Sequence, residues 1–385
     1  MKIRRSLTRA TALASVGLAG LLTLAACSSS SSPTGGQSAA PTQTQAAVQT
    51  TPPDTSGATA PVGPAPSGTA PASAPAQPFP TLTVGTPGIP PVISGLLPYI
   101  ADKEGFYKAF GVDVTVKNFQ TGTDATRALS TGQIDISIVP PAQQVQLAAK
   151  GINLVGIMGQ EKPDWVIASS DPSINSCQKL KGQSLGVDAI GGIRYVALAQ
   201  MLKTCGLTIK DVHPLVFSGN ANPQAMIAGQ LKVSVLHLNE EIDVEQHSGK
   251  QLTTAMSMAT AVPNTMYEIY GVQKSKLPQL RDALVRFDAA QIATLNWMFD
   301  PANADEVAQL GTVVGDSQAT MKAAMEQYKQ VGFWTLDGPG MPVANIDQVI
   351  KGQVAAGNVQ AGQAPNAAGL IDPSIYADAQ KLVQS

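Results

Sequence analysis

The sequence predicts an α/β protein with two lobes, each built on a mixed, mostly parallel sheet, joined by a hinge and separated by a cleft. Three observations support this fold class. Beyond residue 80, short apolar runs alternate with helical stretches, which is typical of βαβ units. One such unit occurs twice in the chain. The 385 residues also leave room for two domains of about 100–200 residues each.

The elements expected in the first lobe follow from hydrophobic periodicity. Continuous or alternating apolar residues predict strands, and wider apolar spacing followed by a glycine predicts helices. The expected strands cover residues 81–84, 112–116, 134–139 and 154–158. The expected helices cover residues 96–104, 123–131 and 142–150.

The internal repeat is the most informative feature of the sequence. Residues 132–139 (GQIDISIV) recur 97 residues later as residues 229–236 (GQLKVSVL). Upstream of them, residues 119–129 loosely match residues 217–226. Two copies predict two lobes of related build, whereas a solenoid would need about three or more.

The second lobe is expected to be inserted within the first. Its predicted strands at 184–187 and 213–217 and its helix at 193–205 precede the second repeat copy. A returning strand at 267–272 is followed by amphipathic helices at 278–299, 301–310 and 317–331. The first lobe is therefore predicted to comprise residues 81–166 and 262–385, and the second residues 167–261. Two crossings between the lobes form a hinge.

The N-terminus is typical of an exported lipoprotein. Residues 1–27 are interpreted as a signal peptide, because basic residues precede an apolar run that ends in Leu24-Ala25-Ala26-Cys27. That ending resembles the bacterial lipobox, which implies acylation of Cys27, with palmitate as an acyl chain, and anchoring at the extracytoplasmic face of the cell membrane. The alternative is a cleaved secretory peptide with an incidental cysteine. Residues 28–80, rich in Pro, Ser, Thr and Ala, are expected to form a disordered tether.

The two remaining cysteines are predicted to form a disulfide. Cys177 precedes the strand at 184–187, and Cys205 ends the helix that follows this strand. A helix that returns across its strand brings its last residue back to the end where the strand began. An extracytoplasmic compartment favours oxidation. The alternative is a pair of buried free thiols.

Several segments together carry a family resemblance. They are residues 97–107 (LPYIADKEGFY), 110–114 (FGVDV), 122–125 (GTDA), 132–135 (GQID) and 180–187 (LKGQSLGV). In order and spacing they resemble the alkanesulfonate, taurine and nitrate group of ABC-importer solute-binding proteins. The resemblance implies a type II periplasmic-binding fold, no catalysis and ABC permease subunits as partners, and we expect a monomer without a cofactor. Lys232 departs from the pattern, because an acidic residue is usual at its position.

Ligand-binding residues are expected at the carboxyl ends of the strands, where loops lead into helices. In the first lobe the candidates are Ile89, Ser94, Gln120, Thr121, Gly122, Thr123, Pro140 and Gln143. In the second lobe they are Ile190, Gly192, Arg194, Asn220, Asn222, His237 and Asn239. Trp165, at the first crossing, is expected either to stack on the solute or to pack in the core.

The chemistry of these loops favours an anion. Unpaired N–H groups at helix starts attract negative charge, so residues 120–123 and 190–192 are candidate cradles. Arg194 would add a bidentate fork, or else it faces solvent along its helix. His237 either donates to the anion or has a structural role. Glu240 and Glu241 are expected to be solvated.

These features predict a lipid-anchored protein that closes on a small organic anion, sulfonate-like or carboxylate-like, and delivers it to an ABC importer. The net charge of −2 gives no basis for nucleic-acid binding. The three histidines occupy unrelated places, so no metal site is expected. One alternative is a sensing or adhesion lipoprotein without transport. Another is an enzyme related to the pyrimidine-forming thiamine enzymes, against which the lipobox argues.

Overall fold

The computed structural model describes residues 79–384 apart from residues 161, 189, 191, 218–220 and 264. The expected signal peptide, Cys27, most of the expected tether and Asn220 lie outside the described residues. Among the helices that the structure describes, none is both long and apolar enough to cross a membrane.

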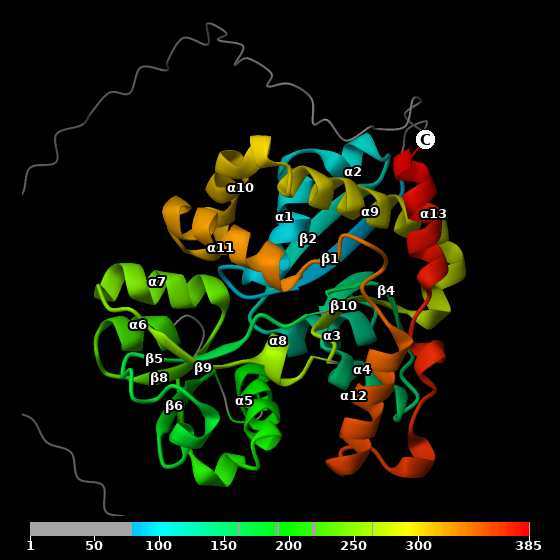
Figure 1. Cartoon of the computed structure of the whole chain (residues 1–385). Helices are drawn as coiled ribbons and strands as arrows, with labels where there is room; N and C mark the ends of the chain where they lie inside the picture. Colours follow the sequence, from blue (N-terminus) through cyan, green and yellow to red (C-terminus); the bar gives the residue numbers. More distant parts are fainter. Residues whose placement is uncertain are drawn as a thin grey trace, which may run out of the picture. The chain divides into compact units, whose positions relative to one another are not determined.

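The first sheet has five strands in the order β2-β1-β3-β10-β4. Figure 1 labels β2, β1, β10 and β4 of this sheet. They are β1 (Thr81–Pro87), β2 (Asp113–Phe119), β3 (Ile136–Val139), β4 (Leu154–Gln160) and β10 (Glu268–Gln273). β1 pairs in parallel with β2 and β3, and β10 is antiparallel to β3 and β4. Every residue of β4 is buried, which explains why its sequence is a nearly continuous apolar run rather than an alternation.

The second sheet repeats this arrangement in the order β7-β6-β8-β5-β9. Its strands are β5 (Val166–Ser169), β6 (Ser184–Val187), β7 (His213–Val216), β8 (Val233–Leu236) and β9 (Thr253–Ser257). β6 is parallel to β7 and β8, and β5 is antiparallel to β8 and β9. β3 and β8, which carry the repeated sequence, hold the same central position. The predicted fold of two mixed sheets is confirmed.

The repeat extends to a close contact made by a glycine in each sheet. Gly85 lies in β1 and Gly186 in β6, the second strand in each order. A Cβ atom at Gly85 would lie 2.5 Å from Ile134 Cδ1, and one at Gly186 would lie 2.5 Å from Leu231 Cδ2. Ile134 and Leu231 occupy the same place in the two repeat copies. In each sheet the glycine therefore lets an aliphatic side chain reach the strand backbone.

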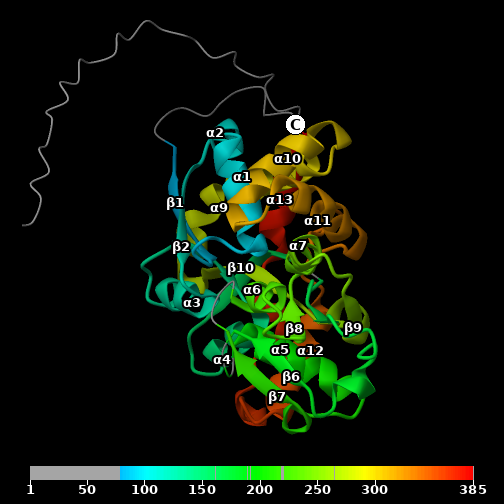
Figure 2. The same cartoon turned by 90° about the vertical axis from the view of Figure 1, so that its left-hand side faces the viewer.

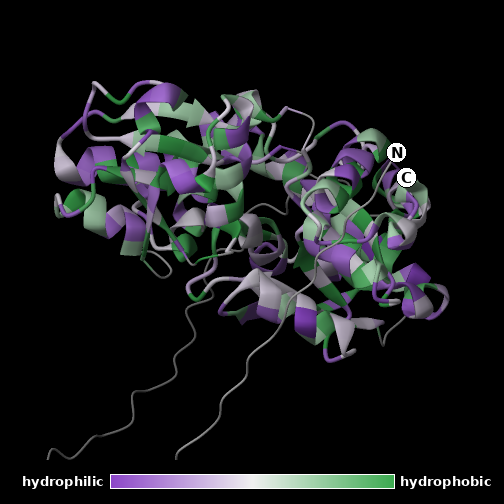
Figure 3. Ribbon diagram, turned by 90° about the horizontal axis from the view of Figure 1, so that it is seen from below, coloured by the Kyte–Doolittle hydropathy of each residue, from purple (hydrophilic) through white to green (hydrophobic). Residues whose placement is uncertain are grey.

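The helices between the strands are short. They are α1 (Leu96–Lys103), α2 (Phe106–Ala109), α3 (Gly122–Ser130), α4 (Pro141–Ala148), α5 (Ile193–Thr204), α6 (Ala221–Ile227), α7 (Leu238–Ser248) and α8 (Met258–Ala261). Figure 3 shows hydrophilic and hydrophobic residues side by side on the helices, as expected for helices with one buried face.

The C-terminal helices connect to both sheets. They are α9 (Leu277–Met298), α10 (Ala304–Gly311), α11 (Gln318–Val331), α12 (Val343–Ala355) and α13 (Pro373–Gln384). α9 packs on α13, α1 and α2, and α12 packs on α4 (Figure 2). α11 packs on α10 and also on α7, the helix that follows β8 of the second sheet. α11 is therefore a direct link between the C-terminal helices and the second sheet.

Most expected elements occur within a few residues of their predicted bounds, but β5 and β9 were not expected. β5 has four residues, all buried, and such a short run carries no periodicity. β9 (TTAMS) is an edge strand of mixed polarity. The antiparallel direction of β5 and β10 follows from the two crossings between the sheets: the chain leaves the first sheet after Gln160 and re-enters it at Glu268.

The predicted disulfide is confirmed, with Cys177 and Cys205 joined and their Cα atoms 6.4 Å apart. Cys177 begins a short 3-10 helix, Cys177–Leu180, before β6, and Cys205 is the residue that follows α5. The bond therefore ties the end of α5 to the chain that enters β6, as the return geometry of a helix after its strand predicts.

Replacing both cysteines by serine is expected to lower the free energy of unfolding by about 3 kcal/mol, because a closed loop of this length restricts the unfolded chain. Urea unfolding under non-reducing conditions measures the difference. Reduced wild-type protein should unfold at the same urea concentration as the variant. Equal stability of the oxidised wild type and the variant would contradict the prediction.

Candidate functional site

A small cavity of about 60 Å³ lies where segments that follow strands of both sheets meet. Its lining residues are Val92, Ile93, Pro223, Gln224, His237, Asn239, Glu240, Asp243, Val314, Gly315 and Asp316. They come from the loop after β1, from the first turns of α6 and α7, and from the loop before α11. A space of this size holds about two water molecules. The cavity is thus at the carboxyl ends of strands, where the sequence predicts a ligand site.

A buried ion pair fixes the start of α7. Two nitrogens of Arg194 each lie 2.6 Å from a carboxylate oxygen of Glu240, and one also donates to the Val235 carbonyl at 2.8 Å. Glu240 in addition accepts from the backbone N–H of His237 at 2.9 Å. Burial acts to raise the pKa of Glu240, but the Arg194 charge and hydrogen bonds outweigh it and hold that pKa below its ordinary value.

The structure corrects the expectations for both partners. Arg194 is only 4% exposed and its fork is occupied by Glu240, so it neither faces solvent nor presents a free fork to a solute. Glu240 is buried rather than solvated, and Glu241 is half-buried. The cause is local, because Glu240 is the third residue of α7. From there its carboxylate reaches back to the N–H of the residue before the helix, as in a capping box.

A chain of hydrogen bonds links the first crossing to α7 and α11. Asp164 lies 2.8 Å from His237 Nδ1 and accepts from the Tyr328 hydroxyl at 2.9 Å. The same hydroxyl lies 2.6 Å from Asn239 Oδ1, and Asn239 Nδ2 donates to Asp316 at 2.5 Å. Burial and the Asp164 charge raise the pKa of Tyr328 well above its ordinary value, so the phenol keeps its proton. The chain joins α7 to α11 at the cavity wall.

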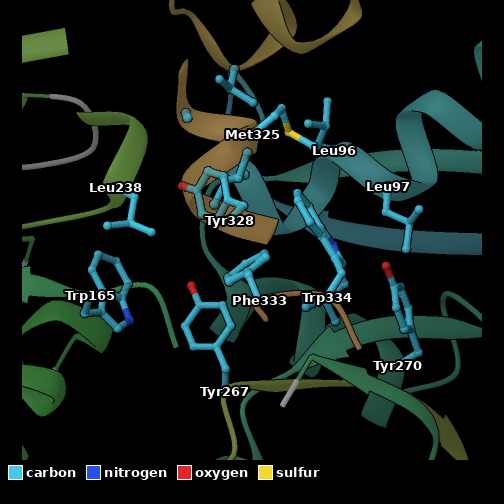
Figure 4. Close-up of a cluster of buried hydrophobic side chains, with 14 of the residues drawn as sticks. Leu96, Leu97, Trp165, Leu238, Tyr267, Tyr270, Met325, Tyr328, Phe333 and Trp334 are labelled. Carbon is cyan, nitrogen blue, oxygen red and sulfur yellow. The ribbon is translucent and has the colours of Figure 1, made fainter. Parts of the chain in front are cut away.

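Aromatic side chains lie near Tyr328, one member of this chain (Figure 4). Trp165 is buried and stacks on the His237 ring, with centroids 3.7 Å apart, and the Arg194 guanidinium lies 5.0 Å from the Trp165 ring. Tyr267 meets Trp165 edge-on at 6.3 Å, and Phe333 lies 5.4 Å from Tyr267. Trp165 therefore packs against protein groups in this structure.

Three buried polar side chains at one end of the first sheet each have an atom without a hydrogen-bond partner among the described residues. These atoms are Ser94 Oγ, Gln160 Oε1 and Glu268 Oε2, and we call the three residues the buried trio. Gln160 ends β4 and Glu268 begins β10, and the two are register partners, so their side chains share one face of the sheet. Gln160 Nε2 donates to the Ser94 carbonyl at 3.3 Å, which brings Ser94 to the same place.

Burial raises the pKa of several carboxyl groups here. The pKa of Glu268 rises to about 8 because of burial, and the Asp164 charge adds to the shift. The nearby Ser94 hydroxyl opposes the shift, although the two side chains do not complete a hydrogen bond. On the cavity wall, burial likewise raises the pKa values of Asp243 and Asp316.

A second group of expected site residues lies at the starts of α3 and α4, outside the cavity lining. It comprises Gln120, Thr121, Gly122, Thr123, Pro140 and Gln143. Gln143 Nε2 donates to Thr123 Oγ1 at 2.9 Å, so the two expected loops do meet. Thr121 caps α3 by accepting from the Asp124 N–H at 3.1 Å.

The remaining expected residues are spread out. Ile89 and Ile190 are exposed at 58% and 65%. A Cβ atom on Gly192 would lie 2.5 Å from the Asp188 carboxylate. Asn222 is buried and has a structural role, because its Nδ2 donates to the Phe217 carbonyl and its Oδ1 accepts from Ser234.

Sequence reasoning missed the acidic and phenolic members of the site. Glu268 carried a signal, since it is the one charged residue in the apolar run 267–272 (YEIYGV). The spacing of His237 and Glu240 also fits a capping box. Asp316 and Tyr328 carried no signal, because only tertiary packing brings α11 to α7. Within the described part of the chain, no three His, Cys, Asp or Glu side chains group as metal ligands.

Comparison with known families gives one match that spans more than half of the chain. The family described as NMT1/THI5 like matches residues 94–304. Curated protein sequences give no match.

Many solved structures resemble this one. A putative periplasmic sulfonate-binding protein of an ABC transporter from Methylobacillus flagellatus KT has 13% identity and a TM-score of 0.62, over 80% of this chain and 95% of that chain. The periplasmic nitrate-binding protein of Synechocystis PCC 6803 has 11% identity and a TM-score of 0.63, over 79% and 89%. A desulfurization enzyme has 15% identity and a TM-score of 0.55, over 78% and 99%. At these identities the likeness establishes the fold. The chain therefore belongs to the NMT1/THI5-like family and has the type II periplasmic-binding fold.

Proposed function

We propose that this protein is the solute-binding component of an ABC importer and that it captures a small solute by closing around it. The observation that carries the proposal is a cavity at the carboxyl ends of strands whose wall is held by hydrogen bonds between α7 and α11. The names of two similar structures, a sulfonate-binding component of an ABC transporter and a nitrate-binding protein, support it by analogy.

Closure rests on a small number of polar contacts between α7 and the C-terminal helices. Asn239 bonds to Tyr328 and Asp316, and Gln246 Oε1 accepts from Thr320 Oγ1 at 2.7 Å. Opening breaks these bonds and separates the packed faces of α7 and α11. A solute that contacts both walls shifts the equilibrium towards the closed form, which the permease then recognises.

Binding rather than catalysis fits the charged groups around the cavity. Asp164 is engaged by His237 and Tyr328, and Glu240 by Arg194. These groups hold the walls of the site together. The organic anion expected from the sequence receives no support from this lining, because Arg194 is neutralised and the wall carries carboxyl groups.

The N-terminal sequence supports a membrane location for this function. We propose that Cys27 carries the lipid anchor, that the chain works as a monomer at the extracytoplasmic face, and that residues 28–80 tether it to the membrane. ABC permease subunits in that membrane are the proposed partners.

The anchor is tested by Cys27→Ser expressed in a bacterial host. The variant is expected to lose incorporation of an alkyne-labelled palmitate and to leave the membrane fraction, because a thiol is the acceptor for the acyl chain. Cys177→Ser serves as the control and should keep the label. Unchanged labelling of Cys27→Ser would refute the anchor.

Solute capture is tested by titrating small amines, amidines, sulfonates, carboxylates and nitrate into the purified protein. A true solute at 100 times its Kd adds about 2.7 kcal/mol of stability, which corresponds to a rise in Tm of about 5 °C. Small-angle scattering should show a decrease in the radius of gyration at the same concentrations. If neither the panel nor any copurifying compound has these effects, the function is wrong.

The closing contacts are tested by Asn239→Ala. Loss of the bonds to Tyr328 and Asp316 is expected to weaken solute binding about thirtyfold, since each of the two bonds contributes about 1 kcal/mol. The matched control is Asn358→Ala, which removes a bond to Gln353 in α12 and should leave affinity unchanged. Calorimetric titration compares the two. An equal loss in both variants would count against a role for α7 in closure.

A further inference from the structure

The buried trio is a concentration of unsatisfied polar groups at the end of β4 and the start of β10. Ser94 directly follows Ile93, which lines the cavity, and all three trio side chains are at most 3% exposed. A buried polar atom without a partner costs about 1–3 kcal/mol. Native proteins rarely gather several such atoms without a reason, and a bound solute is one reason that explains all three.

The free atoms of the trio define what a solute must offer. The amide nitrogen of Gln160 is engaged by the Ser94 carbonyl, so its free atom is the oxygen, which only accepts. Glu268 Oε2 accepts when the carboxyl is ionised, and the Ser94 hydroxyl can donate or accept. When Glu268 is ionised, a partner for this set must therefore bring at least two hydrogen-bond donors.

The charges around the trio also favour a cationic solute. The Asp164 carboxylate lies close enough to act on Glu268, and both carboxyl groups raise the pKa of the buried Tyr267 phenol after the larger effect of burial. Arg194 is buried nearby, against Trp165, but Glu240 already neutralises it. An anion placed here would add negative charge without a free cation, whereas a cation would compensate Glu268.

Aromatic rings complete the environment. Tyr267 adjoins Glu268 in the chain, and Trp165 and Phe333 pack on Tyr267. The faces of such rings favour planar or cationic groups over hydrated anions. The region therefore combines acceptor oxygens and the Asp164 charge with aromatic rings that pack on Tyr267, the residue before Glu268.

We propose that the solute, within the solute-binding function proposed above, carries a protonated amine or amidine group that donates hydrogen bonds to Glu268 and Gln160. Ser94 supplies a third contact. The solute class is thus a small organic cation rich in N–H donors, and the specificity residue is Glu268.

Binding of such a cation changes the protonation of Glu268. The carboxyl group, with a pKa of about 8, is mostly protonated at pH 7 in the absence of solute. A cation stabilises the ionised form, so binding at pH 6.5–7 releases close to one proton into the buffer. The titratable groups that act on Glu268 or feel its charge are Asp164, Tyr267 and Tyr270.

The experiment uses pairs of probes that match in shape and differ in charge. Acetamidine is compared with acetate, and benzamidine with benzoate, by calorimetric titration of the purified full-length protein at pH 7. The amidines are expected to bind at least tenfold more tightly than the matched carboxylates. Binding releases a proton that the buffer takes up. The measured binding enthalpy of the amidines should therefore change with the ionisation enthalpy of the buffer.

Glu268→Gln tests the residue itself, with the exposed Glu326→Gln as the matched control. The Glu268 variant should lose about tenfold or more in amidine affinity, along with the proton release, and the control should lose neither. Misfolding is excluded by a second measurement. The folded protein holds more protons than the unfolded chain between the ordinary pKa of 4.5 and about 8, so wild-type stability falls as the pH rises through that window. Glu268→Gln has no carboxyl group to ionise at this position, so its stability does not fall in this way. The variant should melt at or above the wild-type Tm at pH 8.5.

The outcomes separate this inference from the function on which it rests. Tighter binding of acetate, benzoate, nitrate or a sulfonate than of the amidines overturns the cation proposal while solute binding stands. Amidine binding that is unchanged in Glu268→Gln also overturns it. Failure of every probe, together with the absence of any copurifying solute, rejects the solute-binding function itself.

Discussion

The buried ion pair between Arg194 and Glu240 organises everything around the cavity. Burying two charges carries a desolvation cost that such a pair only partly recovers, so its value lies in what it positions. It joins α5 to the first turn of α7 and to the carbonyl of Val235 at the end of β8. His237 and Asn239 lie in the same turn, and they reach the first crossing and α11. The pair therefore acts together with these contacts to orient the turn.

The fold was largely predictable because its main signal is local. The repeat, alternating apolar runs and terminal glycines define β1, β3, β6 and β8 and the helices between them, and these patterns depend on neighbouring residues only. The disulfide followed from the same regular geometry. β5 could not be found in this way, because four buried residues beside a crossing read equally well as a buried loop.

The site was predictable in location but only in part in chemistry. The rule that ligands bind at carboxyl ends of strands predicts His237, Asn239 and Ser94 as site residues; the first two line the cavity, and Ser94 is a member of the trio. The same rule assigned Arg194 to a solute. Nothing in the sequence shows that Glu240, 46 residues later, will bind the Arg194 guanidinium group. Electrostatic partners across long separations are set by tertiary structure, and they decide the sign of the charge that a site accepts.

The placement of β10 has a consequence for how the chain folds. β10 lies between β3 and β4, yet it is made about a hundred residues after β4, once the whole second sheet has been made. The first sheet is therefore divided into two unjoined parts until that strand arrives. Contacts of such long sequence separation form slowly, so the insertion of this central strand should be a late step in maturation. A nascent chain cut short before residue 268 would expose the open edges of β3 and β4, which could pair with the edge strand of another chain.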